Sequence, residues 1–196
     1  MPYMARILVS FIVNDSVSSC CSLVVLTLVA TPFFLRKAHR DLKPDNICLS
    51  SIYGDAKIID TGLIRDVAEG HGTRGLSTRV GTPWYTPPFG ASKTHDEYST
   101  GMILCQLICG KIPFNMPYER EFTGENAKKA LENDLYRQSG LSNSLGLDSQ
   151  ELRLLFSLIV GFLEPNNEKR MNYIQGLGQV KELNRRITAW KGGSLG

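Results

Sequence analysis

The chain has 196 residues, of which 42% are hydrophobic and 21% are charged, and its formal net charge is +3. That length and apolar content suffice for one hydrophobic core, while two complete domains would be crowded. The small net charge, without a basic cluster interleaved with aromatic residues, argues against nucleic-acid binding. The five cysteines have apolar neighbours and no metal-ligand spacing, which predicts reduced thiols in an intracellular, cytoplasmic protein.

Residues 16–35 form a run of 20 residues without a charge. As a helix this run would be about 30 Å long, which matches the hydrocarbon core of a bilayer. Arg36 and Lys37 would then flank a cytoplasmic end of a membrane-associated protein. Several Ser and Thr residues and Pro32 dilute the apolar character. Two other interpretations therefore stay open: a core helix that precedes the next motif, or a stretch that arises from a misplaced start codon or a retained intron.

Residues 39–46 read HRDLKPDN, and this run resembles the catalytic loop of serine/threonine protein kinases. The resemblance implies phosphoryl transfer, a reaction in which positioning and charge neutralisation carry most of the catalysis. It assigns Asp41 to orienting the attacking hydroxyl, Lys43 to stabilising charge on the phosphoryl group and Asn46 to holding Mg²⁺. His39 is expected to support the loop.

Two short β-rich segments, 47–49 and 56–59, flank a Gly/Asp turn and predict a hairpin. This hairpin is expected to bring Asp60 beside the catalytic loop. The run DTG that begins at Asp60 resembles the DFG motif, whose Asp ligates the Mg²⁺ that bridges the nucleotide phosphates. Thr61 replaces the Phe whose packing sets the active state. The expected contacts with ATP and Mg²⁺ are Lys43, Asn46 and Asp60.

Residues 63–82 are polar and contain Gly, Ser and Thr, which fits an activation loop. The run GTPWYTPPF that begins at Gly81 is similar to the GTPxYxAPE stretch that closes such a loop and lines the substrate groove. The resemblance implies that Thr82 contacts the catalytic Asp and helps to select Ser or Thr. Thr78 matches the usual activation phosphosite, with Arg40 as the partner of the phosphate. The alternative is that Thr78 is an ordinary loop threonine.

The closing motif departs from the family pattern in two places. Phe89 stands where the pattern has Glu, and Pro87 stands where it has Ala. The resemblance gives this Glu an arginine partner, which corresponds to Arg170. A buried Arg that loses its carboxylate destabilises the fold by several kcal/mol. The alternative is that Arg170 lies exposed in this chain.

The run that begins at Asp96 resembles the DxWSxG start of the long central helix of the family, whose Asp holds the backbone of the catalytic loop. Between residues 101 and 109 only Gln106 is strongly polar. A helix that is apolar on all sides is a buried helix.

Two further helices are expected in the last fifty residues. Asp148 and Glu151 predict an acidic capping box, and apolar residues follow at helical spacing up to Leu163, where Pro165 ends the helix. A last helix near residues 174–190 carries an apolar stripe that is weakened at its start by two glycines.

These motifs follow one another in the family order, so the chain is identified as a member of the protein kinase family. The matching part resembles its large, C-terminal lobe, which implies a mainly α fold (α+β overall) with a short β-hairpin beside the catalytic loop. Residues 1–38 contain no Gly and no Glu. They therefore lack the Gly-rich loop and the Lys–Glu pair that clamp ATP in this family.

We expect residues 1–35 to be a separate segment and residues 36–196 to be a partial kinase domain that is inactive alone. The resemblance implies ATP, Mg²⁺ and a protein substrate as partners. The alternative is a non-catalytic, pseudokinase-like binding module that recruits partners through its helical surface.

Overall fold

The computed structural model describes residues 37–49, 56–66, 81–88, 94–109 and 149–193. The uncharged run 16–35, Thr78, Phe89 and Asp148 lie outside these ranges. Within the described ranges, no helix combines the length and the hydropathy that crossing a membrane requires.

Four short strands lie near the N-terminal side of the described chain. Strands β2 (Ile47–Leu49) and β3 (Ala56–Ile58) pair antiparallel, with Ile47 opposite Ile58. This pairing confirms the predicted hairpin. Strand β1 (Lys37–Ala38) pairs with β4 (Arg65–Asp66), which the sequence did not predict.

Two 3-10 helices place the polar residues of the loops. Helix η1 (Pro44–Asn46) precedes β2, and η2 (Pro83–Tyr85) follows Thr82. Each begins with a proline, whose fixed φ suits the first position of a helix and whose missing N–H is not needed there. The residue before each proline is extended, as Lys43 and Thr82 both are.

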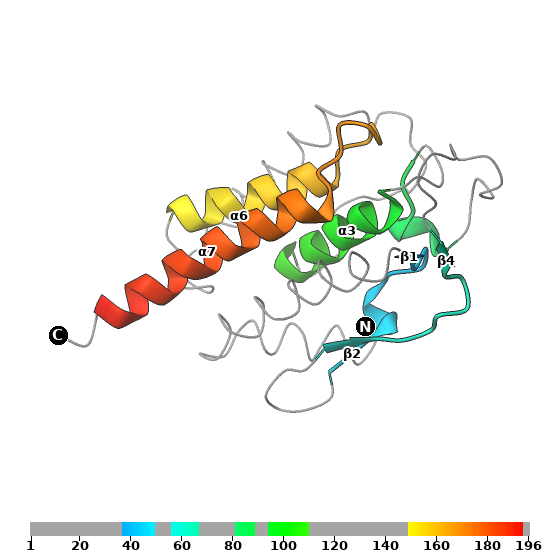
Figure 1. The fold of residues 1–196 in the computed structure, drawn as a ribbon, viewed down its shortest axis with the longest axis horizontal. Coiled ribbons are helices and arrows are strands. Elements are labelled where there is room, and N and C mark those ends of the chain that lie inside the picture. The colour runs from blue at the N-terminus through cyan, green and yellow to red at the C-terminus, as the bar shows by residue number, and fades with distance from the viewer. Residues whose placement is uncertain (1–36, 50–55, 67–80, 89–93, 110–148, 194–196) are drawn as a thin grey trace.

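Three α-helices form the body of the described chain: α3 (His95–Cys109), α6 (Ser149–Phe162) and α7 (Tyr173–Gly193). Figure 1 shows α6 and α7 side by side, with α3 next to them and the strands beyond α3. The observed bounds confirm the three helices expected from the sequence. Residues 101–105 of α3 are all buried, as its apolar composition predicted.

The core lies where the three helices meet. Fully buried apolar side chains of α3 and α6 fill it, and Tyr173 of α7 packs edge-to-face on Phe162 with ring centroids 5.9 Å apart. Gly101 allows the close approach of α3 and α6, because a Cβ there would lie 2.9 Å from the Cβ of Phe162. The largest members of this core are Leu42, Ile47, Met102, Ile103, Leu158, Ile159 and Phe162.

Helix η2 is fastened to α3 by two hydrogen bonds of Tyr85. Its carbonyl oxygen accepts from the Ser99 hydroxyl at 2.8 Å, and its own hydroxyl donates to Oε1 of Gln106 at 2.5 Å. Gln106, the polar residue of the apolar part of α3, thus has a buried partner. The segment that carries Thr82 is thereby held against the central helix.

Candidate active site

The first turn of α3 holds the backbone of His39 and Arg40. Asp96 accepts hydrogen bonds from the N–H of His39 at 2.5 Å and from the N–H of Arg40 at 2.9 Å. Arg40 has a positive φ of 70°, a conformation that a non-glycine residue rarely adopts. The two bonds to Asp96 fix this strained residue and thereby the direction of the next side chain, Asp41. The contact predicted between Asp96 and the loop is present.

Asp96 is 2% exposed. Burial raises the pKa of its carboxyl group, and the two N–H groups of Arg40 and His39 oppose that rise. The charge of Arg40 also lowers the pKa of Asp96. The ionised form of Asp96 is therefore stabilised by the N–H groups of the loop that it holds.

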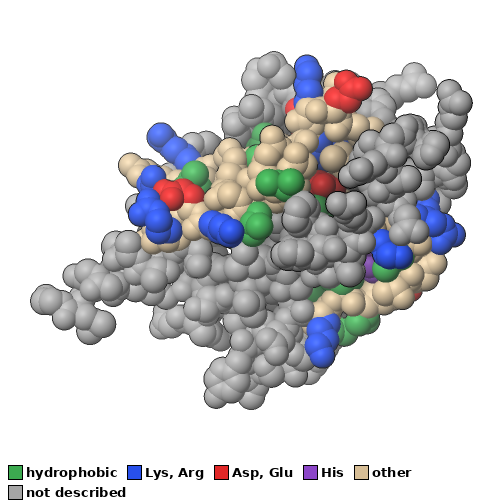
Figure 2. All heavy atoms as spheres, viewed as in Figure 1, with side chains coloured by type: hydrophobic (Ala, Val, Ile, Leu, Met, Phe, Trp, Pro, Cys, Tyr) green, Lys and Arg blue, Asp and Glu red, His purple; other side chains and the backbone are tan. Residues whose placement is uncertain are grey.

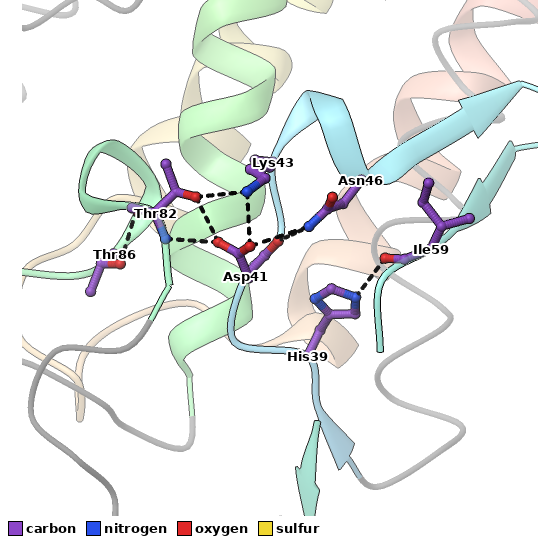
Figure 3. A network of polar contacts seen from close by, with 7 residues as sticks. All are labelled: His39, Asp41, Lys43, Asn46, Ile59, Thr82 and Thr86. Atoms are coloured by element: carbon purple, nitrogen blue, oxygen red, sulfur yellow. Dashed lines mark hydrogen bonds and ion pairs between the residues drawn. The ribbon is translucent and has the colours of Figure 1, made fainter. Parts of the chain in front are cut away.

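Asp41 is the centre of a polar cluster that also contains Lys43, Asn46 and Thr82 (Figure 3). Its Oδ1 accepts from the N–H and from the hydroxyl of Thr82, both at 2.7 Å. Its Oδ2 accepts from Nζ of Lys43 at 2.9 Å, and Lys43 also donates to the Thr82 hydroxyl at 3.0 Å. The sequence placed these residues in two separate motifs, and the fold brings them together.

The environment of Asp41 keeps it ionised. Burial alone would raise its pKa, but the hydrogen bonds from Lys43 and Thr82 hold the pKa below its ordinary value. The side chain retains an exposed fraction of 11%, and that of Lys43 retains 23%. An anion that water and other molecules can reach is the arrangement that a proton-accepting group needs.

The amide of Asn46 is oriented by Asp41. Its Nδ2 donates to the backbone oxygen of Asp41 at 2.8 Å and to Oδ2 of Asp41 at 3.3 Å. Both partners are acceptors, which assigns the nitrogen to this side and turns the amide oxygen away, as Figure 3 shows. The oxygen is the atom that a hard cation such as Mg²⁺ would take.

Asp60 follows a strand end that is tied to Asn46. The N–H of Ile59 donates to the backbone oxygen of Asn46 at 2.9 Å, and the oxygen of Ile59 lies 3.1 Å from Nε2 of His39. Asp60 itself is exposed and has a φ of 61°. The exposed carboxylate of Asp60 and the amide oxygen of Asn46 are both the kind of oxygen donor that suits Mg²⁺.

Gly81 brings the segment of Thr82 against the loop of Asp41. Its φ is 99°, and a Cβ at this position would lie 2.3 Å from the carbonyl oxygen of Arg40. Both the left-handed backbone and the close approach exclude larger residues. The glycine therefore sets the distance at which Thr82 reaches Asp41.

The guanidinium group of Arg40 is buried, and its Nε and Nη2 atoms have no hydrogen-bond acceptor among the described residues. Burial and the nearby Arg65 lower its pKa, while Asp96 raises it. Two cations close together form an environment that favours an anion. Thr78, the predicted phosphosite, lies outside the described residues, so its pairing with Arg40 stays a prediction.

Arg170 is buried, with an exposed fraction of 3%, so the alternative that it lies exposed is wrong. Backbone oxygens accept its N–H groups: those of Glu164 at 2.8 Å, Pro165 at 3.0 Å and Thr94 at 2.9 Å. Its guanidinium carbon also lies 5.2 Å from the ring centroid of Tyr98. Burial lowers the pKa of Arg170 to about 10. Carbonyl groups that helix and loop ends leave unpaired make this burial tolerable.

Two of the residues that depart from the family pattern, Thr61 and Pro87, lie in the described ranges, and they differ in burial. Thr61 is exposed, so it does not fill the core as the expected aromatic ring would, and Pro87 is buried. Phe89 lies outside the described residues.

Sequence reasoning missed one charged residue of this region, Glu97, which is 6% exposed. It stands next to Asp96 in a helix that was expected to be buried. The signal in the sequence was an acidic residue within a helix that was expected to be buried, which indicates a buried acid.

Figure 2 shows Lys and Arg side chains in separate groups on the visible face, with acidic side chains beside some of them. The described residues do not form one continuous basic patch on that face. The expectation against nucleic acid stays a prediction.

Comparison with known proteins gives a family match. The family described as "Protein kinase domain" matches residues 25–180. The receptor-like protein kinase BRI1-like 3 of Arabidopsis thaliana is 32% identical over 157 residues, covering 74% of this chain and 13% of that protein. The probable serine/threonine-protein kinase fhkA of Dictyostelium discoideum is 29% identical over 182 residues, covering 75% of this chain and 29% of that protein.

A third relative matches a shorter stretch of the chain at higher identity. The serine/threonine protein kinase OSK3 of Oryza sativa subsp. japonica is 40% identical over 83 residues, covering 39% of this chain and 16% of that protein. The chain thus spans less than a third of the length of each of these relatives.

Proposed function

This chain belongs to the protein kinase family, of the serine/threonine type, and from that premise we propose that residues 36–196 are the helical large lobe of an enzyme that phosphorylates Ser or Thr in proteins. ATP is the phosphoryl donor in this proposal. The cluster of Asp41, Lys43 and Thr82 is the observation that carries it, because it fixes an ionised carboxylate at an accessible position.

In this proposal Asp41 accepts a hydrogen bond from the hydroxyl group of the substrate. The hydroxyl oxygen forms a bond to the γ-phosphorus of ATP while the bond from that phosphorus to the oxygen of ADP breaks, and the hydroxyl proton passes to Asp41. The lowered pKa of Asp41 suits it to orienting the hydroxyl group and to accepting the proton late in the phosphoryl transfer.

Lys43 has a second task once the phosphates are present. In the structure its ammonium group donates a hydrogen bond to Oδ2 of Asp41 at 2.9 Å. A partly exposed, flexible ammonium can turn toward a phosphoryl oxygen, which frees Oδ2 for the substrate hydroxyl. Thr82 keeps Oδ1 fixed during this exchange through its N–H and its hydroxyl.

Asn46 and Asp60 are the proposed Mg²⁺ ligands, through the amide oxygen and the carboxylate. When bound, Mg²⁺ neutralises negative charge on the phosphates. The chain's own contribution is orientation: Asp41 fixes the amide of Asn46, and the bond from Ile59 to Asn46 ties down the residue before Asp60.

The proposal assigns the 196 residues little transfer activity on their own. Residues 1–38 contain no Gly, no Glu and one Lys, so they supply no Gly-rich loop or Lys–Glu pair for the nucleotide. Positioning both reactants accounts for much of the rate acceleration of such a reaction. We expect activity when a small lobe of a serine/threonine protein kinase is supplied ahead of residue 36.

The test compares the 196-residue chain with a fusion in which such a small lobe precedes residue 36, using radiolabelled ATP and a generic protein substrate. We expect label on Ser and Thr from the fusion, reduced roughly a hundredfold or more by Asp41→Asn. Asp45→Asn is the matched control, because Asp45 is an exposed acid of the same loop. A folded fusion that transfers no label, or whose transfer survives Asp41→Asn, contradicts the proposal.

The second candidate function is a non-catalytic binding module. Exposed Thr61 favours it, because the aromatic ring that sets the active state is missing. The same fusion distinguishes the two functions: a binding module would stay inactive with the small lobe in place. Reading the 5′ end of the transcript for a Gly-rich loop and a strand Lys is the quicker observation.

A further inference from the structure

A groove of about 800 Å³ lies between α6 and α7, the two helices that run side by side in Figure 1. On the α6 side it is lined by Arg153, Phe156 and Val160, which share one helix face because they are three and four positions apart. Residues between positions 169 and 179 line the opposite side. From Arg153 to Gly161 the helix rises about 12 Å, a length that roughly four extended peptide residues span.

The floor of the groove is apolar and is fixed by the fold. Phe156, Val160 and Met171 pack against the core on one side and remain half-buried. Met171 lies directly on Gly161: its N–H donates to the oxygen of Gly161 at 3.0 Å, and a Cβ at Gly161 would lie 2.4 Å from the Cε of Met171. The absence of a side chain at Gly161 therefore sets where the methionine lies.

The rim of the groove carries free positive charge. Arg153 and Lys169 are exposed, and within the described ranges neither forms an ion pair. The lining also contains one acid, Glu164, whose Oε1 accepts from the N–H of Asn166 at 3.0 Å. The acid thus has a partner inside its own turn, while the two cations are available to a ligand.

Gln179 adds a polar group that the fold does not satisfy. Its Oε1 is buried and has no hydrogen-bond partner among the described residues. A buried acceptor without a donor costs free energy. A backbone N–H of a bound peptide would satisfy it when the amide turns into the groove.

We propose that this α6–α7 groove is a docking site for a short acidic segment of a partner protein that carries an apolar anchor residue. The anchor packs on Phe156, Val160 and Met171, and acidic residues on either side of it face Arg153 and Lys169. The groove contains no residue of the Asp41 cluster, so the docking goes beyond the proposed function and does not depend on it.

A peptide fits this groove better than a small molecule does. Small-molecule sites are enclosed and mostly apolar, whereas exposed Arg153, Ser157 and Lys169 border this groove. Peptide segments bind such surfaces through apolar anchors, and charges at the rim select the partner.

Selection from a random phage-displayed peptide library on the 196-residue chain tests the chemistry of the ligand. We expect enriched peptides in which Asp or Glu flanks an apolar residue, and we expect these peptides to be lost when the same selection uses Arg153→Glu. No enrichment, enrichment of basic or uncharged peptides, or binders that Arg153→Glu retains would overturn the proposal.

Fluorescence polarisation with an enriched, labelled peptide tests the place of binding. Arg153→Glu and Lys169→Glu should each weaken binding by roughly tenfold or more, because each puts an acid opposite an acid. Val160→Thr keeps the shape of the side chain and should weaken binding by roughly threefold, because a hydroxyl replaces a methyl group under the anchor. Glu164→Gln should leave the affinity unchanged or raise it. Variants at Arg153, Lys169 and Val160 that bind as wild type does, or a loss of affinity with Glu164→Gln, contradict the proposed site.

The matched control is Lys57→Glu, because Lys57 is an exposed cation of β3 outside the groove and its reversal changes the net charge by the same amount. Its affinity for the peptide should stay within about twofold of wild type. If Lys57→Glu weakens binding as much as Arg153→Glu does, the peptide responds to the net charge of the chain and the proposal is wrong.

Circular dichroism verifies that each variant is folded, and Arg153→Gln replaces Arg153→Glu if the latter does not fold. Sedimentation of the wild-type chain addresses the other occupant of such a groove, a second copy of the chain. Self-association that Arg153→Glu abolishes would make the second copy the occupant and overturn the proposal.

Discussion

Asp41 and Asp96 both lie beside the backbone of Arg40, yet their surroundings have opposite effects on the two carboxyl groups. Asp41 accepts from Lys43 and Thr82, keeps some contact with solvent, and has a lowered pKa. Asp96 is buried, accepts from two backbone N–H groups, and has a raised pKa. Side-chain partners and access to solvent thus leave Asp41 ready for chemistry, while burial and backbone partners make Asp96 a structural support.

The largest expected effect comes from removing the support. Asp96→Ala should lower the free energy of unfolding by about 3–5 kcal/mol, because two buried hydrogen bonds to a charged group are lost and two N–H groups remain unpaired. Urea unfolding measures this. The control Asp45→Ala, at an exposed site, should stay within about 0.5 kcal/mol of wild type. Equal losses in both variants would contradict the role of Asp96 as the support of the loop.

The next effect concerns the approach of the two segments that build the cluster of Asp41. Gly81→Ala should lower the free energy of unfolding by about 1–3 kcal/mol, because φ is 99° and the new methyl group would meet the oxygen of Arg40. Calorimetry measures the loss. If Gly81→Ala were as stable as wild type, the close contact between these segments would be contradicted.

A smaller effect is expected at Thr82. Thr82→Val keeps the backbone N–H bond to Asp41 and removes the hydroxyl, so it should lower the free energy of unfolding by roughly 1 kcal/mol. It should also raise the pKa of Asp41, which NMR titration of the carboxyl group would follow. Thr82→Ser retains the hydroxyl and should leave that pKa in place. A pKa that does not respond to Thr82→Val would show that Lys43 and the backbone N–H of residue 82 maintain the charge without the hydroxyl.

The smallest effect is a difference in acid stability. A folded-state pKa below the unfolded value means that Asp41 contributes stability above pH 4 or so and loses it as the pH falls through the folded-state pKa. Asp41→Asn should therefore make the free energy of unfolding fall less steeply as the pH drops below about 4. For Asp96, whose pKa is raised, the sign is reversed: its contribution is lost as the pH rises through the folded-state value. Urea unfolding at a series of pH values checks both signs.

The helices and the hairpin could be predicted because their signals are local. Apolar spacing gave α6 and α7 to within a few residues, and β-rich segments around a turn gave β2 and β3. The pairing of β1 with β4 could not be predicted, since each strand has two residues and carries no period. The pairing of such short strands is set by the rest of the fold, which brings residues 37–38 and 65–66 together.

The candidate site was predicted in its parts by the family motifs, including the contacts of Asp41 with Thr82 and of the loop with Asp96. The sequence left open whether Arg170 is buried, because the acceptors described for it are backbone oxygens whose positions depend on the ends of α3 and α6. Glu97 was missed for a related reason. A helical pattern of apolar residues predicts which face is buried, and it does not predict that a charged residue such as Glu97 will also be buried.

The bonds from Asp96 to His39 and Arg40 join groups 57 and 56 residues apart in the chain. During synthesis, at roughly 5 to 20 residues per second, about 3 to 11 seconds separate the emergence of the two partners. Throughout that interval the backbone of Arg40 lacks the carboxylate that holds its left-handed conformation. The loop that bears Asp41 is therefore completed only after the start of α3 has left the ribosome, so a nascent chain that stops before residue 96 carries every residue of HRDLKPDN without its geometry.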